Sequence, residues 1–136
     1  MNATLYAVID TNVIVSAILS KNNDSPTVKI LYKIFDKSLI PVFNEEILQE
    51  YSEVLHRPKF KLNPEVVDNL ISALTDLGLH TNRATYDCPM PDPDDRVFYE
   101  VALGADAYLV TGNIKHFPRS CKVLTPGEML YIIEGE

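Results

Sequence analysis

The 136-residue sequence lacks the features that identify membrane and secreted proteins. No apolar run comes close to the ~20 residues that span a bilayer. Residues 1–4 contain no basic segment, and Asp10 interrupts the first apolar run, so we expect no signal peptide. The two cysteines, Cys88 and Cys121, have no Cys-x-x-Cys partner, which predicts free thiols in a reducing cytoplasm.

Basic residues are also scarce. Lysine and arginine total 12 against 19 aspartates and glutamates, which gives a formal charge of −7. Proteins that bind nucleic acid through bulk charge usually carry a basic patch, so the composition argues against tight binding of long duplexes. The apolar fraction of 46% is ordinary for a globular protein, and the length fits one domain over residues 1–136.

Short apolar segments alternate with helical patterns along the chain. This alternation predicts an α/β fold, a three-layer α/β/α sandwich with a mainly parallel central sheet. The carboxyl ends of parallel strands share one edge of the sheet, where such folds bind their ligands. The expected strands are 5–9, 39–43, 107–111 and 121–124, with a weaker extended segment at 79–86.

Helix starts are marked by capping residues. Ser25-Pro26, Asn44 and Asn63-Pro64 each precede a helical apolar pattern, and Thr125 with Glu128 fits a capping box. Further helices are expected over 13–19 and from Asp95 to Gly104. The inward stripes predicted for helices 26–38 and 64–78 are Val28, Leu31, Tyr32 and Phe35, and Val66, Val67, Leu70, Ile71, Leu74 and Leu77.

Acidic and polar residues gather at the expected ligand edge. Asp10 directly follows the first strand, and Asp95 opens the helix that leads into strand 107–111. Glu50 flanks the apolar stripe of the helix after Asn44, whereas Glu46 and Glu53 are expected to be solvated. Alone, each acid fits a turn, a helix cap or a solvated position, so the functional argument depends on their joint placement.

Carboxylates brought together repel one another unless a cation neutralises them. Mg²⁺ and Mn²⁺ prefer oxygen ligands, and one or two such ions can activate water and stabilise the leaving oxygen in phosphodiester cleavage. Zinc is not indicated, because His56, His80 and His116 are isolated in sequence and each is expected to be a surface or capping residue.

Four sequence blocks together resemble the PIN domain, in the branch of bacterial toxin–antitoxin toxins similar to VapC-type ribonucleases. They are the Asp10-Thr11-Asn12 stretch, the 44–60 segment with Glu50, the Asp92-Pro93-Asp94-Asp95 loop, and 105–113 followed by His116-Phe117. The resemblance implies a cytoplasmic endoribonuclease that uses Mg²⁺ or Mn²⁺ to cleave RNA. It also implies a homodimer and a cognate antitoxin as partners.

Carried over by position, the metal ligands of this family fall on Asp10, Glu50 and Asp95. The fourth catalytic position falls on Asn113, where many members have aspartate, so one charge is missing. Supporting roles fall on Asn12, on Thr111, which would hold the first aspartate, and on Asp92 and Asp94.

Two other hypotheses remain open. The chain could be a non-catalytic PIN-fold module that binds RNA or protein, as the loss of an acid at Asn113 suggests. It could also be a phosphatase of haloacid-dehalogenase type with Asp10 as nucleophile, although that class has a second aspartate where Asn12 stands. Phosphates could be positioned by Lys29, Lys33 and Lys37, which also fit a solvated helix face, or by Arg57, Lys59, Lys61, Lys115 and Arg119.

Overall fold

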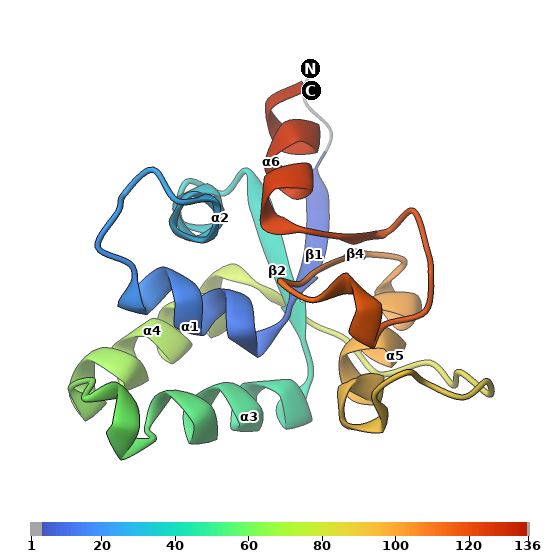
Figure 1. Cartoon of the computed structure of the whole chain (residues 1–136), viewed down its shortest axis with the longest axis horizontal. Helices are drawn as coiled ribbons and strands as arrows, with labels where there is room; N and C mark the ends of the chain where they lie inside the picture. The colour runs from blue at the N-terminus through green and yellow to red at the C-terminus, as the bar shows by residue number, and fades with distance from the viewer. Residues whose placement is uncertain (1–3, 136) are drawn as a thin grey trace.

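The computed structural model describes residues 4–135 and contains a central sheet flanked by helices (Figure 1). The strands are β1 (Leu5–Ile9), β2 (Leu39–Phe43), β3 (Leu79–His80), β4 (Tyr108–Val110) and β5 (Val123–Leu124). The α-helices are α1 (Thr11–Leu19), α2 (Pro26–Phe35), α3 (Glu45–Leu55), α4 (Pro64–Leu77), α5 (Arg96–Ala105) and α6 (Pro126–Gly135). Short 3₁₀ turns are η1 (Pro58–Phe60), η2 (Pro93–Asp95) and η3 (Ile114–His116).

The five strands pair in the order β3-β2-β1-β4-β5, and every pairing is parallel. β1 lies at the centre, where Val8 is in register with Val42 of β2 and Leu109 of β4. The chain moves outward in opposite directions from β1, so the topological switch point lies between β1 and β4. The predicted α/β fold is confirmed, and the position expected for a ligand is the carboxyl end of these two strands.

Helices flank the sheet (Figure 1). On one side α1, α2 and α6 pack together, while α5 packs against β1, β2 and β4. α3 contacts both α1 and α5, and in Figure 1 it runs below the point where β1 leads into α1. The start of α1, the middle of α3 and the start of α5 therefore meet near the end of β1.

Side-chain caps explain where several helices begin. Ser25 accepts a hydrogen bond from the amide of Val28, and Asn44 accepts one from the amide of Ile47 at 2.9 Å. Thr125 and Glu128 exchange hydrogen bonds between side chain and amide at 2.9 and 3.2 Å. These bonds satisfy amides that have no partner within the helix. The predicted caps and the capping box are confirmed.

Two predicted helix faces are partly wrong. Tyr32 and Phe35 of α2 are 53% and 43% exposed, and Val66 of α4 is 58% exposed. On α2 the buried positions include Ile30 and Ile34 instead. Apolar residues occur around most of α2, and its packing against α1, α6 and β2 decides which of them enter the core.

The extended segment predicted over 79–86 forms a strand only at Leu79–His80. Beyond it, a buried carboxylate holds the chain. Arg83 Nε donates to Glu100 Oε1 at 2.7 Å, and the amide of Tyr86 donates to Glu100 Oε2 at 2.9 Å. Arg83 also bonds to Glu46 at 2.9 Å, so that exposed glutamate is paired rather than simply solvated. Side-chain contacts replace strand pairing over this segment.

Cys88 and Cys121 are both exposed free thiols, as predicted. Within residues 4–135, each helix is too short or too polar to cross a membrane.

Candidate metal centre at the carboxyl end of the sheet

Asp10 is buried at the switch point between β1 and β4. Asp10 is only 6% exposed, and its amide donates to the carbonyl of Val110 at 2.9 Å. The hydroxyl of fully buried Thr111 donates to Asp10 Oδ2 at 2.7 Å. Burial raises the pKa of Asp10, and this hydrogen bond partly opposes the increase. Thr111 therefore holds a carboxylate in a largely buried position, where a bound cation would stabilise its charged form.

Glu50 reaches the same region from α3. The hydroxyl of Thr11, the residue after Asp10, donates to Glu50 Oε2. Tyr51 anchors the helix, because its buried hydroxyl donates to the carbonyl of Ile9 at the end of β1. Burial raises the pKa of Glu50, and the negative charge of Asp10 raises it further. Glu50 is thus tied to the first turn of α1 by a hydrogen bond from Thr11.

A second group of ligand atoms comes from η2, from the residue before it, and from η3. His116 Nδ1 lies 3.2 Å from Asp95 Oδ2 and 3.4 Å from Asp92 Oδ2. One ligand atom from each of these three residues lies within 4.8 Å of the others, a spacing compatible with one metal ion. The Asn113 side-chain nitrogen lies 2.7 Å from His116 Nε2. Donation from this amide to Nε2 leaves Nδ1 to donate to Asp95, so His116 has to release this proton before Nδ1 can bind a metal ion.

Asp95 is the carboxyl of the site whose pKa is raised most. Burial, followed by the negative charges of Asp10 and Asp92, raises its pKa to about 6. His116 opposes the increase through its hydrogen bond and charge. The charge of Asp10 therefore contributes to the raised pKa of Asp95. A divalent cation bound between the two carboxylates would relieve their repulsion.

The other predicted supporting residues have different positions. Asn12 Oδ1 accepts a hydrogen bond from the amide of Gly112 at 3.2 Å, which links α1 to the segment after β4. The amide of Asn113 donates to Thr111 Oγ1 at 3.0 Å. Asp94 is exposed, and its amide donates to Asp92 Oδ1 at 3.1 Å. The Asp92 side chain shapes the loop through this bond, and Asp94 is not part of the group formed by Asp92, Asp95 and His116.

His116 was expected to be an isolated surface or capping residue; its side chain is 45% exposed, as a surface residue should be, but it is not isolated. The turn η3 folds it back beneath Asn113 and against Asp95. The other two histidines lie elsewhere, with His56 bonded to Asp68 and His80 near Glu45. The available signal was a histidine three positions after Asn113, in the segment that follows a central strand.

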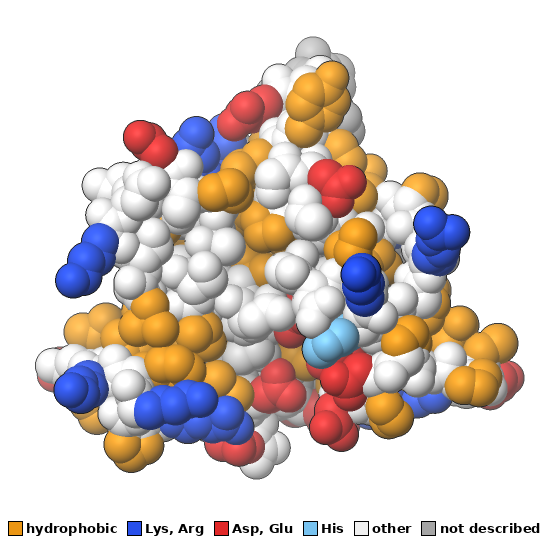
Figure 2. All heavy atoms as spheres, in the orientation of Figure 1, with side chains coloured by type: hydrophobic (Ala, Val, Ile, Leu, Met, Phe, Trp, Pro, Cys, Tyr) orange, Lys and Arg blue, Asp and Glu red, His pale blue; other side chains and the backbone are white. Residues whose placement is uncertain are grey.

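A cleft of about 440 Å³ opens over Asp10, Asp95 and His116. Figure 2 shows acidic side chains gathered in the gap between α3 and α5, next to a histidine. Lysine and arginine side chains lie to either side, over the end of α3 and over the 114–121 segment. The residues lining the cleft are Asp10, Thr11, Asn12, Val15, Ser16, Val54, Phe60, Asp92, Asp95 and His116.

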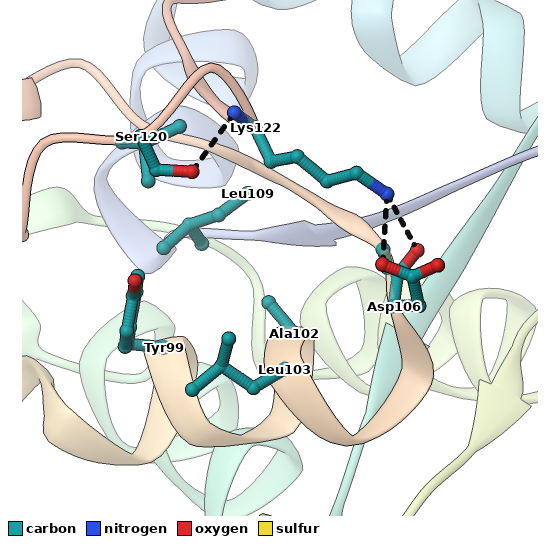
Figure 3. Close-up of a pocket in the computed structure, with 9 residues that line it drawn as sticks. Tyr99, Ala102, Leu103, Asp106, Leu109, Ser120 and Lys122 are labelled. Atoms are coloured by element: carbon teal, nitrogen blue, oxygen red, sulfur yellow. Dashed lines mark hydrogen bonds and ion pairs between the residues drawn. The ribbon is translucent and has the colours of Figure 1, made fainter. Parts of the chain in front are cut away.

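A second cavity, of about 70 Å³, lies between α5 and the β4–β5 edge (Figure 3). Its charged residues are already paired, because Lys122 Nζ lies 3.0 Å from Asp106 Oδ1 and 3.0 Å from the Asp106 carbonyl oxygen. Tyr99, Leu103 and Leu109 supply much of the remaining wall. This cavity is small and its charged residues are paired. Asp10 and Asp95, two of the predicted metal ligands, line the cleft of about 440 Å³, which is therefore the candidate functional site.

Comparison with known proteins shows which family this chain resembles. The family model described as the PIN domain matches residues 6–115. A protein of Methanocaldococcus jannaschii, described as uncharacterized, is 29% identical over 112 residues that cover 80% of this chain and 71% of the relative. No solved structure matches this chain significantly.

Proposed function

Because this chain belongs to the PIN domain family, whose members are typically metal-dependent nucleases, we propose that it is a divalent-metal-dependent endoribonuclease. The observation that supports the proposal is that Asp10 and Asp95 line one cleft with Asp92 and His116, while the charge of Asp10 acts on both Asp95 and Glu50. The pKa of Asp10, of Glu50 and of Asp95 is raised, mainly by burial. A buried, ionised carboxylate lowers the stability of the folded protein, and a bound cation would offset this loss.

The donor set fits Mg²⁺ or Mn²⁺. Asp10 and Asp95 would supply carboxylate oxygens from the cleft wall. Glu50, which accepts a hydrogen bond from Thr11, would supply a further carboxylate oxygen. Asp92 and His116 add donors beside Asp95. When bound, the ion would act as a Lewis acid that activates water and offsets charge on the leaving oxygen of a phosphodiester.

The residues of the chain prepare this site. Thr111 fixes the orientation of Asp10 through its hydroxyl, and Thr11 does the same for Glu50. Asn113 bonds to His116 and thereby orients the imidazole toward Asp95. In this proposal Asn113 positions a neighbouring group, so the absence of an acid at this position is compatible with activity.

We further propose that the enzyme is the toxin of a toxin–antitoxin pair, acts in the cytoplasm and forms a homodimer. The exposed apolar residues Tyr32 and Phe35 of α2 support a protein interface, because large apolar side chains in solvent are costly. Light scattering of the purified protein tests the dimer. Co-expression with the product of the adjacent open reading frame tests the antitoxin, which should bind this chain and stop RNA cleavage.

The main alternative is a PIN-fold module that binds RNA or protein without cleaving it. The observation that favours it is Asn113, which takes the place of an acid. Calorimetric titration separates the two functions, because a site that binds neither Mg²⁺ nor Mn²⁺ at millimolar concentration supports the binding module. The phosphatase hypothesis is set aside, because Asn12 occupies the position of its second aspartate and bonds to Gly112.

The nuclease proposal is tested by incubating end-labelled single-stranded RNA with the protein and Mg²⁺ or Mn²⁺. Wild type should cleave, whereas Asp10→Ala and wild type in EDTA should not. Asp76→Ala is the matched control, since Asp76 is an exposed aspartate on α4. Equal cleavage by wild type and Asp10→Ala would refute the proposal.

A further inference from the structure

Part of the cleft wall is apolar, which metal binding alone does not require. Val15 of α1, Val54 of α3 and Phe60 of η1 line the same cleft as Asp10 and Asp95. All three apolar side chains are only partly buried and lie outside the fully buried core. An apolar wall beside a group of acids fits a ligand that has both a charged part and a flat, weakly polar part.

The backbone of η1 fixes Phe60 at this position. The amide of Phe60 donates to the carbonyl of Arg57 at 3.1 Å, and the amide of Lys61 donates to the carbonyl of Pro58 at 3.1 Å. Pro58 restricts the first residue of the turn, and Lys61 closes it in the left-handed conformation with φ of 55°. The ring is therefore presented on a short, well-defined turn.

Positive charge surrounds this ring. The ammonium group of Lys59 lies 5.1 Å from the centroid of the Phe60 ring, within the range of a cation–π interaction. Lys59 and Lys61 are exposed, and Arg57 is exposed beside Glu53. An aromatic ring flanked by lysines is the combination by which proteins bind single-stranded nucleic acid, through base stacking and phosphate contacts.

We propose that Phe60 stacks against an unpaired base of the RNA, next to the phosphate that is cleaved, and that Lys59 contacts a neighbouring phosphate. This inference rests on the proposed nuclease function and specifies its substrate. A base inside a duplex is already stacked on its neighbours, so the platform selects single-stranded or looped RNA. Loss of one base–aromatic contact is expected to weaken binding about tenfold to a hundredfold.

Binding is measured with a fluorescein-labelled single-stranded RNA of ten nucleotides and with an abasic oligomer of the same length. Ca²⁺ replaces Mg²⁺, and gels verify that the RNA stays intact. Phe60→Ala should lose at least tenfold in affinity for the RNA and change little with the abasic oligomer. Lys59→Ala should weaken both alike, because it removes a phosphate contact. Phe60→Tyr should retain most of the affinity.

A second readout uses the absence of tryptophan from the sequence. Phe60→Trp places a single tryptophan in the cleft, whose emission can be excited apart from that of the tyrosines, and Phe35→Trp places one at an exposed position on α2. RNA should quench the first strongly and the second little. This readout does not require Phe60→Ala to fold normally.

The possible failures are distinguishable. If wild type cleaves RNA while Phe60→Ala binds RNA and the abasic oligomer as wild type does, the platform is refuted and the nuclease stands. That result would assign the apolar wall to a protein partner. If Phe60→Trp is not quenched at saturating RNA, the platform is also refuted. If wild type neither binds nor cleaves RNA, both the nuclease and the platform are refuted.

Discussion

Replacing Asp95 with asparagine should make the metal-free protein more stable while removing its response to metal. Asp95 is 18% exposed in its side chain and lies near Asp10 and Asp92, whose charges disfavour its ionised form. Asparagine resembles the protonated carboxyl in shape and carries no charge. Asp95→Asn therefore removes the repulsion that the folded protein tolerates for function.

The size of the effect follows from the pKa of Asp95, which is about 6 in the folded protein against a reference value of 3.8. One pKa unit corresponds to ~1.4 kcal/mol, so the ionised carboxylate costs about 3 kcal/mol of unfolding free energy. Because the folded pKa is raised, the stability is fully present below pH 3.8 and is lost as the pH rises through 6. The gain from Asp95→Asn should be about 3 kcal/mol at pH 8 and about half that at pH 5.

Urea unfolding in EDTA at both pH values measures this gain. Asp94→Asn is the matched control, because Asp94 is an exposed neighbour, and it should change stability by less than about 0.5 kcal/mol. Saturating Mn²⁺ should stabilise wild type and leave Asp95→Asn nearly unchanged. The reasoning is refuted if Asp95→Asn is no more stable than wild type at pH 8, or if its gain is the same at both pH values.

Three further substitutions test separate parts of the structure. Thr111→Val should cost about 1–3 kcal/mol in urea unfolding at pH 8 and lower kcat, because a buried carboxylate loses its hydroxyl donor. His116→Ala should weaken Mn²⁺ binding more than Mg²⁺ binding in calorimetry, since imidazole suits transition metals better, whereas His56→Ala should change neither. Arg83→Ala should destabilise the protein by about 1–3 kcal/mol, because buried Glu100 loses its nearest cation and keeps Arg96 at 3.8 Å.

Controls of similar chemistry accompany these variants. Thr75→Val, on the exposed surface of α4, should change stability and kcat little. Lys122→Ala removes a surface ion pair with Asp106 and should cost less than about 1 kcal/mol. Equal losses in a test variant and its control would show that the site contacts have no special role.

The sequence was most informative where a local rule decides the outcome. Strand 39–43 and the caps Ser25, Asn44 and Asn63 were predicted correctly, because apolar runs and caps act over a few neighbouring residues. The convergence of Asp10 and Thr111 was also accessible, since parallel strands bring their carboxyl ends to one edge.

Features that depend on distant contacts were not accessible. Nothing local marks Glu100 as buried, because its burial depends on Arg83, seventeen positions earlier. The exposure of Tyr32 depends on where α1, α6 and β2 pack against α2. His116 and Phe60 reach the cleft through short 3₁₀ turns, whose paths the periodicity of apolar residues does not predict.

The central claim is that this cleft hydrolyses RNA with a divalent ion and water. The most direct measurement is mass spectrometry of the new ends that wild type produces from a defined single-stranded RNA with Mn²⁺. Attack by water predicts linear phosphate monoesters, with no products from Asp95→Asn or in EDTA. Cleavage that persists in EDTA and leaves 2′,3′-cyclic phosphates would contradict the account.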